Sequence, residues 1–466
     1  MNEVRIDYTN ALTESVGRKN GIGKKELADL TERTAMVHAD LAARRKAGEL
    51  PFYDLPYQNV TKVLQLVSKR CSSFDNVVTL GIGGSGLGAR ALGRALLKPY
   101  NELMDNASRQ GCPRLYVADN IDPENFMGLL GALNLSKTMF IVISKSGETA
   151  ETMSQFLIAR DLLIKKYGED GYRERMISIT DQEKGYLREI TDRDGLEWLP
   201  VPAGVGGRYT VFTPVGLLPA AVCGMDVVAL LKGAAAMDQR TREPELLKNP
   251  AYLLAALFYL ADVKRKKNIL VVMPYSSGLT DLAEWFQQLW AESLGKAVHL
   301  DGSPAGTGST PVRALGATDQ HSQVQLYKEG PADKLVAFFR VDRFRDDARI
   351  PTDFSDIEGV AYLGGHSLGE LINAEQLATE VALAKAGRPS LRIELPHVDA
   401  DVMGQVMYML EVATVFAGGL YQVNPLDQPG VEAGKRYTNA LMGKKGFDQE
   451  REEIEKMVKG RKRFIL

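Results

Sequence analysis

The chain has 466 residues, of which 45% are hydrophobic and 25% charged, and these values are ordinary for a globular protein. This length exceeds that of a typical single domain, so we expect two domains. Lys and Arg number 57 and Asp and Glu number 59, which gives a net charge of −2. That balance argues against nucleic acid or an anionic membrane as the main partner.

Three cysteines, Cys71, Cys112 and Cys223, are scattered without C-x-x-C spacing. Their spacing predicts neither a disulfide framework nor a zinc site, and buried free thiols in a reducing compartment are the simpler interpretation. The N-terminal MNEVRIDYTN lacks the apolar core of a signal peptide. The longest apolar run, 211–231, contains two prolines and Asp226, so we interpret it as buried helix and turn. We therefore expect a cytoplasmic protein.

Residues 1–72 are polar and helix-like and predict an N-terminal helical arm. Strands alternate with helices after this arm, which predicts a parallel sheet with helices on both faces. The sequence NVVTLGIGGSGLGARALGRAL (76–96) has the pattern of strand, glycine turn and helix. Further strands are predicted at RLYVAD (114–119), TMFIVI (138–143) and RMISIT (175–180).

After a helical stretch with the basic end KRKK (264–267), the pattern restarts at NILVVMPYSSGLTDLAEWF (268–286). Both openings consist of a strand, then Ser-Gly-Leu, then a helix, which indicates a weak internal repeat. The sequences DKLVAFFRV (333–341) and LRIEL (391–395) predict later strands of this second domain. The expected segments are a helical arm (1–72), a first α/β domain (73–225), a helical connection (226–267), a second α/β domain (268–425) and a helical C-terminal segment (426–466).

The turn GIGGSG (81–86) fits the G-x-G-x-x-G pattern of dinucleotide-binding turns. Such folds place an acidic residue at the end of the next strand, roughly 20 residues further on. Asp119 ends the next predicted strand here, but it follows Gly86 by 33 residues. The pattern alone leaves a nucleotide site and a ligand-free structural turn equally open.

A second turn, SKSGET (144–149), follows a predicted strand and opens a predicted helix. Backbone N–H groups and the helix dipole at such a position attract an anion, and Gly147 lets a ligand approach the backbone closely. Further donors come from Ser144, Lys145, Ser146 and Thr149. Plain helix capping, with Glu148 in a capping role, is the alternative. The density of donors favours a cradle for a phosphate monoester, and the lack of a P-loop sequence disfavours a nucleoside triphosphate.

Glu292 lies on the predicted helix 278–296, whose apolar face includes Trp285 and Leu289. It projects from that buried stripe, three residues before Gly295, a predicted C-cap. Burial and the negative end of the helix dipole both disfavour its charge, which suits a general base. The alternative is a Glu paired with Arg or Lys.

Other candidates stand in polar, glycine-rich segments. His321 lies in a long stretch (308–331) that we expect to be an ordered loop, where a hydrogen-bonded structural role is the alternative. Arg208 follows Gly206 and Gly207, which would let its guanidinium reach a ligand, although a buried salt bridge is also open. In the segment 424–443, Gln428 lies in a turn and Lys435 about two turns into the following helix, where a surface Lys is the default.

Taken together, these segments resemble the phosphoglucose isomerase family. The matches are GIGGSGLG, ISKSGETAET, VGGRY, LWAESLGK, ATDQHSQVQL and QPGVEAGK, in the family's order from about residue 76 to 440. SKSGET, TDQH and QPGVE depart from the animal-type pattern, so the chain is similar to the compact bacterial type. The resemblance implies two sugar-isomerase (SIS) domains, each a doubly wound parallel α/β sandwich, with helical N- and C-terminal extensions.

The resemblance also implies residue roles in converting glucose 6-phosphate to fructose 6-phosphate, a step of glycolysis and gluconeogenesis. Phosphate would bind Ser144, Ser146 and Thr149, with Lys145, Gly84 and Ser85 nearby. His321 and Lys435 would open the sugar ring, and Glu292 would move a proton between C2 and C1 through a cis-enediol. Arg208, beside Gly207, would stabilise the developing charge, and Gln428 would orient the sugar. No metal or cofactor is required for this proton shift. The family forms homodimers, so His321 is expected to serve the partner's site.

Three alternative functions remain open. The turn 81–86 is compatible with an NAD-dependent dehydrogenase, but Glu292 and the turn 144–149 would then have no role. A non-catalytic SIS module that senses sugar phosphates would lack a base, which Glu292 argues against. An isomerase that also accepts mannose 6-phosphate is not excluded by any residue in the chain.

Overall fold

The computed structural model describes residues 3–70 and 73–466, so Cys71 lies outside the described residues. The chain divides into two compact units, residues 1–425 and 426–466. Within the larger unit Cys223 is buried, as expected, whereas Cys112 is half-buried.

The N-terminal part is mainly helical, as predicted. Its helices include the 3₁₀ helix η1 (Thr9–Ala11), α1 (Thr13–Val16), α2 (Lys24–Ala28), α3 (Thr31–Lys46), the 3₁₀ helix η2 (Pro51–Tyr57) and α4 (Thr61–Arg70). It also contains a short strand, β1 (Arg5–Asp7), that the sequence did not predict. Because β1 pairs antiparallel with a strand near residue 393, the N-terminal arm is joined to the second half of the fold.

The first sheet is entirely parallel and has five strands. In spatial order they are β3 (Arg114–Ala118), β2 (Asn76–Leu80), β4 (Thr138–Ile143), β5 (Met176–Asp181) and β6 (Glu197–Val201). In chain order this arrangement is 2-1-3-4-5, a doubly wound topology that places ligands where the strand order reverses. That point lies between the neighbouring strands β2 and β4.

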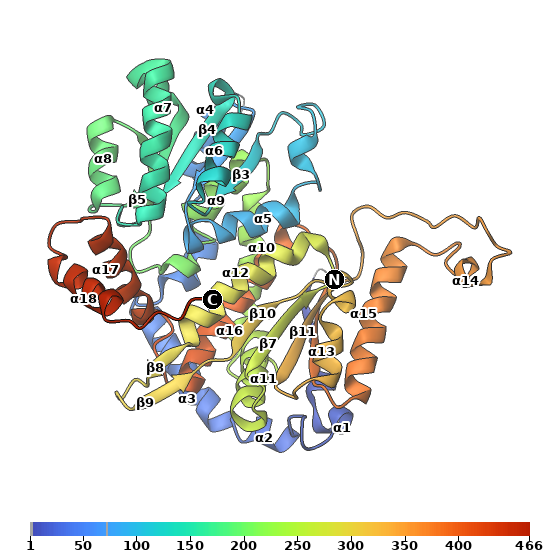
Figure 1. Ribbon diagram of the computed structural model, residues 1–466. Coiled ribbons are helices and arrows are strands. Elements are labelled where there is room, and N and C mark those ends of the chain that lie inside the picture. The colour runs from blue at the N-terminus through green and yellow to red at the C-terminus, as the bar shows by residue number, and fades with distance from the viewer. Residues whose placement is uncertain (1–2, 71–72) are drawn as a thin grey trace. The chain divides into compact units, whose positions relative to one another are not determined.

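Helices cover both faces of this sheet, as Figure 1 shows. The helices are α5 (Leu87–Leu96), α6 (Pro123–Ala132), α7 (Ala150–Arg175), α8 (Tyr186–Asp194) and α9 (Pro214–Val222). Alternate strand residues such as Val78 and Phe140 pack with Phe126 of α6 and Phe156 of α7 in one apolar cluster. Helices α5 and α9 contact strands from the other face. α7 bends at Gly168, where the backbone is not helical.

The second sheet repeats the order of the first. Its strands are β1, β12 (Ser390–Leu395), β11 (Lys334–Val341), β7 (Ile269–Pro274) and β10 (Thr310–Arg313). The last four are mutually parallel, and in chain order they read 2-1-3-4, as in the first sheet. The internal repeat is therefore present in the topology, and the chain is an α/β protein with two parallel sheets. The exact domain limits stay a prediction.

The helices around the second sheet complete the larger unit. They are α10 (Val227–Thr241), α11 (Pro250–Arg265), α12 (Thr280–Leu294), α13 (Val324–Glu329), α14 (Glu358–Ala361), α15 (Leu368–Lys385) and α16 (Ala400–Tyr421). A separate hairpin pairs β8 (Lys296–Val298) with β9 (Pro304–Thr307). The stretch 308–331 is not a loop, contrary to expectation: it contains β10, the 3₁₀ helix η9 (Thr318–His321) and α13.

Helix α16 is the central helix of the larger unit and packs against α10, α11 and α12. Among the described residues it is the one helix long and apolar enough to cross a membrane, and 94% of its apolar window is buried inside the fold. The run 211–231 also behaves as predicted, because it forms the buried helix α9, a turn, and the start of α10 capped by Asp226.

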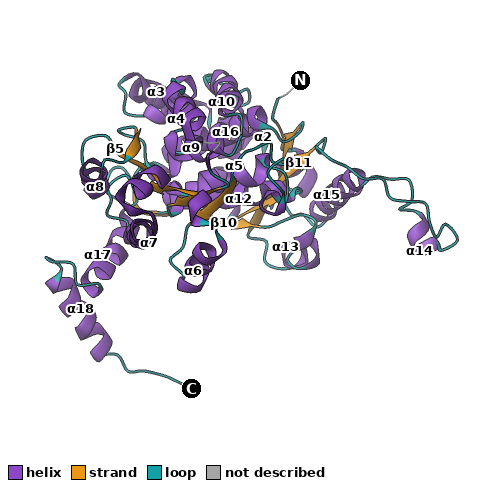
Figure 2. Ribbon diagram, turned by 90° about the horizontal axis from the view of Figure 1, so that it is seen from above, coloured by secondary structure: helices purple, strands orange, loops and turns teal. Residues whose placement is uncertain are grey.

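Residues 343–367, between β11 and α15, extend away from the second sheet with α14 near the tip (Figure 1 and Figure 2). We call this segment the 343–367 extension. Several of its apolar side chains are exposed: Phe354, Ile357, Val360 and Tyr362.

The smaller unit contains the 3₁₀ helix η10 (Pro429–Val431) and the helices α17 (Glu432–Leu441) and α18 (Asp448–Lys459). Arg436 of α17 pairs with Glu450 of α18, and Tyr437 donates to Glu453 at 2.9 Å. The segment is helical, as predicted, up to Lys459, and α18 is charged and largely exposed.

Candidate active site

The glycine turn after β2 lies against the segment that carries Arg208. An added Cβ at Gly84 would overlap the carbonyl of Gly207, so this close approach requires glycine at position 84. The Thr210 hydroxyl lies 2.7 Å from the Gly207 carbonyl oxygen and 3.0 Å from that of Gly84. The fold thus places Gly84 and Ser85 beside Gly207 and Arg208, although more than 120 residues separate the two segments.

The turn after β4 is stabilised mainly by its own hydroxyl groups. The buried Ser144 Oγ accepts the N–H of Gly147 at 3.0 Å and lies 3.4 Å from the Thr149 hydroxyl. Ser146 Oγ accepts the N–H of Glu148 at 3.1 Å. Gly147 is in the left-handed region (φ 70°), and an added Cβ would overlap the backbone of Leu187. The hydroxyl groups of Ser144 and Ser146 therefore stabilise the turn itself. For these two residues the capping alternative is correct in part.

Thr149 behaves differently from a capping residue. It is the N-cap of α7, yet its side chain makes no capping hydrogen bond. The first backbone N–H groups of a helix have no acceptor within the helix, and those of α7 open onto the turn. The remaining donors of this turn are therefore suited to an anion at the start of α7.

Lys145 connects this turn to the segment that precedes Arg208. Its Nζ donates to the carbonyl of Val205 at 3.4 Å, and its side chain is exposed. The turns after β2 and β4 and the segment 205–208 consequently lie together, at the strand-order reversal of the first sheet.

Arg208 and Glu292 form an ion pair, with Nη1 3.3 Å from Oε2. The Arg208 side chain is 2% exposed and that of Glu292 is 32% exposed. The guanidinium also donates from Nε to Ser293 Oγ at 2.8 Å and from Nη2 to the Pro425 carbonyl at 2.7 Å. The sequence left open a buried salt bridge for Arg208 and a pairing with Arg or Lys for Glu292. Both side chains are indeed paired, and each is the other's partner.

The position of Glu292 differs in part from the expected one. It lies in the last turn of α12, and Gly295 is the C-cap, in an extended rather than a left-handed conformation. Glu292 is at the edge of the apolar face, not within it, while its neighbour Ser293 is fully buried. The carboxylate is consequently open to solvent on one side, where a ligand can approach it.

Three neighbours of this pair were not identified from the sequence. Ser293 accepts from Arg208, and the Tyr209 hydroxyl lies 3.0 Å from Ser293 Oγ. Gln288, one helical turn before Glu292, donates to Glu292 Oε1 at 3.2 Å, and its amide is close to Gly83. Sequence adjacency and the i, i+4 spacing were the available signals for these residues.

His321 ends η9 and is exposed. Within the described residues it makes no hydrogen bond or ion pair, whereas the adjacent Asp319 accepts from Leu315 N–H at 2.7 Å and from Ser322 at 2.6 Å. Burial alone would raise the pKa of Asp319, but these hydrogen bonds outweigh it and lower that pKa. The structure thus leaves the His321 ring open to the surface and does not bring it into contact with Glu292.

Lys435 and Gln428 belong to the smaller unit. Lys435 lies in the first turn of α17, not two turns into it, because the helix starts at Glu432. Its Nζ pairs with Glu432 at 2.8 Å, and both side chains are more than half exposed. Gln428 immediately precedes η10.

Asp119, the acidic residue of the dinucleotide alternative, is paired with Arg90. Among residues 3–70 and 73–466 we find no group of three or more His, Cys, Asp or Glu side chains arranged to hold a metal ion.

Together, a doubly wound fold, a turn at its switch point that opens a helix, and a partly exposed carboxylate–guanidinium pair are features of an α/β enzyme with a small-molecule ligand. Residues 65–458 match the family described as phosphoglucose isomerase. The chain belongs to the phosphoglucose isomerase family, and it is an isomerase.

Individual relatives agree with this assignment. The chain is 43% identical to a glucose-6-phosphate isomerase of Carboxydothermus hydrogenoformans, over 99% of both chains. It is 44% identical to a glucose-6-phosphate isomerase of Rubrobacter xylanophilus, over 96% of this chain and 100% of that one. The crystal structure of a hypothetical protein from Thermus thermophilus is also similar to this chain. Its sequence is 35% identical, and the two structures superpose with a TM-score of 0.83 over 95% of this chain and 100% of that one.

Proposed function

We propose that this chain interconverts D-glucose 6-phosphate and D-fructose 6-phosphate, in glycolysis and gluconeogenesis. The observation that carries the proposal is the Arg208–Glu292 pair beside the glycine turns (3.3 Å). An aldose–ketose isomerisation needs a base that moves one proton between neighbouring carbons and a positive group that stabilises the oxyanion of the enediol. Glu292 supplies the base and Arg208 the charge.

The phosphate of the substrate binds the turn 144–149. Thr149 and the first N–H groups of α7 donate to it, and the Ser146 hydroxyl, which already accepts from Glu148, donates its proton outward. Ser144 supports the turn from below, and Lys145 adds a charge. Gly84 and Ser85 complete the cradle, because the turn after β2 lies at the same switch point.

Arg208 is fixed before substrate arrives. Its contacts with Ser293 and with the Pro425 carbonyl hold the guanidinium in one orientation, so little reorganisation is required when negative charge develops. Gln288 orients the Glu292 carboxylate from the opposite side.

Ring opening is assigned to His321 and Lys435, and Gln428 orients the sugar. We further propose a homodimer in which His321 acts in the partner's site. Two features support this: the ring of His321 is exposed, and exposed apolar side chains occur on neighbouring elements, at Leu326 of α13 and at Leu377 and Val381 of α15. α13 packs against both η9 and α15, so these side chains form a surface near His321 that a second copy would cover.

The remaining parts of the proposal concern the setting. The protein acts in the cytoplasm on a small phosphosugar, without nucleic acid or membrane as a partner. The proton shift between adjacent carbons requires neither a metal nor a redox cofactor.

A coupled assay with glucose 6-phosphate, mannose 6-phosphate and free glucose tests the proposal. We expect turnover of glucose 6-phosphate to fructose 6-phosphate and none of free glucose. Turnover of mannose 6-phosphate would add a second substrate without changing the reaction class. Saturable NADH binding together with no turnover of any sugar phosphate would contradict the proposal and favour the dehydrogenase.

A further inference from the structure

A pocket lies among α3, η2, α10 and α11, and it is lined by none of the candidate active-site residues. Its volume is about 550 Å³, within the range of pockets that hold small molecules. Its polar and aromatic lining includes His38, Arg45, Lys46, Tyr53, Arg242 and Tyr252.

The Tyr53 hydroxyl is the unusual group in this pocket. The Tyr53 side chain is only 6% exposed, and within the described part of the chain its hydroxyl makes no hydrogen bond. Neighbouring hydroxyls are all partnered: Tyr57 and Tyr408 donate to Asp238 at 2.7 Å, and that of Tyr252 lies 2.9 Å from His38 Nδ1. Although the ring is buried, the hydroxyl oxygen is not among the fully buried atoms of the described residues, and Tyr53 lines the pocket. The hydroxyl is therefore free to donate to a group bound there.

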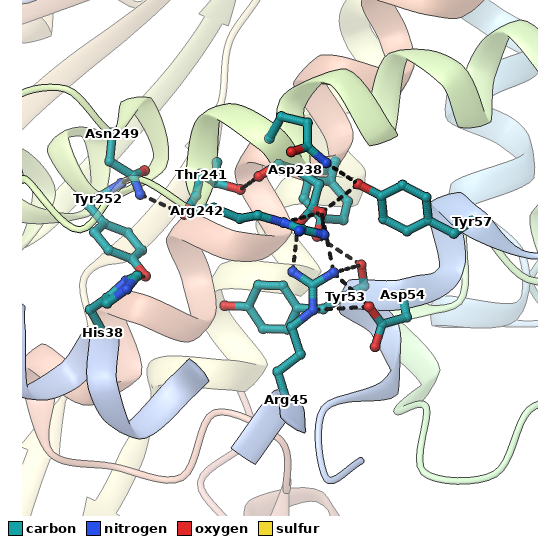
Figure 3. A network of polar contacts seen from close by, with 12 residues as sticks. His38, Arg45, Tyr53, Asp54, Tyr57, Asp238, Thr241, Arg242, Asn249 and Tyr252 are labelled. Atoms are coloured by element: carbon teal, nitrogen blue, oxygen red, sulfur yellow. Dashed lines mark hydrogen bonds and ion pairs between the residues drawn. The ribbon is translucent and has the colours of Figure 1, made fainter. Parts of the chain in front are cut away.

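The orientation of Tyr53 supports that expectation. Figure 3 shows its hydroxyl pointing away from the Asp238 network, toward the side on which His38 and Tyr252 lie. Burial raises the pKa of Tyr53 well above its ordinary value. The hydroxyl therefore remains protonated and offers a hydrogen bond to an acceptor in the pocket.

The charges around the pocket favour an anion. Three cations, Arg45, Lys46 and Arg242, stand against two carboxylates, Asp54 and Asp238. Burial lowers the pKa of His38, so its ring adds no charge. Lys46 is exposed, and it forms no ion pair within the described residues. The lining thus carries one net positive charge.

The two arginines are held in place by Asp238 (Figure 3). Arg45 bonds to Asp238 at 2.7 Å and to Asp54 at 2.6 Å, and Arg242 bonds to Asp238 at 2.7 Å. Burial alone would raise the pKa of Asp238, but hydrogen bonds from Arg45, Tyr57 and Tyr408 outweigh it, so the carboxylate stays charged. A site with such fixed side chains needs little reorganisation to bind a ligand.

We propose that this pocket binds a small organic anion whose oxygen accepts a hydrogen bond from the Tyr53 hydroxyl and whose charge faces Lys46, Arg45 and Arg242. The site is separate from the candidate active site, and η2 carries an aromatic contact between the two. On η2, Phe52 lies between Tyr53 and Tyr209, with ring centroids 4.3 and 5.0 Å away, and Tyr209 adjoins Arg208.

Isothermal titration of the full chain tests the proposal, with citrate as a carboxylate probe and glycerol 3-phosphate as a phosphate-ester probe. We expect saturable binding of at least one probe. Tyr53→Phe, which removes only the hydroxyl, should weaken that binding at least fivefold, and so should Lys46→Glu at the exposed rim. Lys62→Glu, a charge reversal at an exposed lysine of α4, should leave it unchanged.

The double variant Ser146→Ala/Thr149→Ala separates this pocket from the candidate active site. It should weaken any binding of glycerol 3-phosphate at the turn 144–149 and keep the saturable binding that Tyr53→Phe and Lys46→Glu weaken. Loss of probe binding in that variant would place the probe in the active site and overturn the proposal. No saturable binding of either probe, or equal binding by the Tyr53→Phe and Lys46→Glu variants, would overturn it as well. If Tyr53→Phe lowers the melting temperature, its weaker binding could come from lost stability. Lys46→Glu changes an exposed residue and then provides the independent test of the site.

Discussion

Glu292 and Arg208 show how far reasoning about single residues extends. A helix period and a predicted C-cap were enough to single out Glu292, and two glycines drew attention to Arg208. Neither pattern indicates that the two side chains meet, because the contact joins positions 84 residues apart. The partly exposed state of Glu292 was also not predictable, since it depends on what packs beside the end of α12.

Glu292→Gln preserves the shape of the side chain and removes the base. We expect turnover of glucose 6-phosphate to fall by roughly 100-fold or more, the usual scale for loss of general base catalysis, while affinity for the phosphosugar changes little. Glu284→Gln on the same helix serves as the control and should retain activity. Turnover of the Glu292 variant within a few-fold of the unaltered chain would remove Glu292 from the proposed role.

Glu411 is a residue that sequence patterns did not single out. It lies in the middle of α16, is fully buried, and neither carboxyl oxygen has a hydrogen-bond partner in the described residues. Burial raises the pKa of Glu411 well above its ordinary value. Because the folded pKa is raised, the carboxyl stabilises the fold most at acidic pH, and that contribution is lost as the pH rises through the folded pKa.

Glu411→Gln should therefore change the pH dependence of stability. Between about pH 5 and the raised pKa, the unaltered chain is expected to lose about 1.4 kcal/mol per pH unit relative to the variant. Melting temperatures of both proteins at pH 5, 6, 7 and 8 provide the measurement. A melting-temperature difference that stays constant across this range would mean that Glu411 titrates normally in the folded state.

At the scale of elements, sequence patterns predicted the central strands and the edge strand β3, but they missed the edge strands β1, β6 and β10. β4 matches its prediction residue for residue, β2, β7 and β11 lie within theirs, and β12 begins one residue before its predicted start. β6 and β10 stand at sheet edges and contain Pro200 and Pro311, which an edge position tolerates but a strand pattern does not indicate. β1 has three residues, too few to give a periodic signal.

The turn 144–149 leads to a prediction that separates ligand binding from helix capping. Ser146→Ala/Thr149→Ala removes two hydroxyl donors and leaves the helix N-terminus. Charge-assisted hydrogen bonds contribute roughly 1.5–3 kcal/mol each, so affinity for glucose 6-phosphate should fall by roughly 100-fold or more without vanishing. Isothermal titration provides the affinity.

A thermal melt of the same variant decides between the two interpretations. Of the two hydroxyl groups removed, only that of Ser146 accepts a backbone N–H. The loss of folding stability should therefore stay near about 1 kcal/mol. Ser154→Ala, which removes an exposed hydroxyl from α7, is the control and should bind normally. A destabilised double variant with unchanged affinity for glucose 6-phosphate would leave Ser146 and Thr149 as capping residues only.

At the scale of the whole molecule, the alternation of strands and helices predicted the fold class, and the repeated Ser-Gly-Leu predicted the repeat now visible in two sheets of the same strand order. The meeting of the turns after β2 and β4 follows from that order, because adjacent parallel strands end at one edge. Long-range contacts such as Gly84 with Gly207 did not follow, since they depend on packing between segments distant in sequence.

The exposed position of His321 makes the homodimer testable by subunit mixing. If each site combines Glu292 of one subunit with His321 of the other, Glu292→Gln and His321→Ala homodimers are both defective. A mixed dimer then contains one site with both defects and one with neither. After denaturation and refolding of an equal mixture, half of the dimers are mixed and half of their sites are intact, so activity should return to about a quarter of that of the unaltered protein.

If His321 instead acts within its own chain, every site of a mixed dimer carries one defect, and mixing restores nothing. Each variant refolded alone supplies the baseline, and sedimentation confirms that dimers form, so recovery above that baseline places His321 in the partner's site.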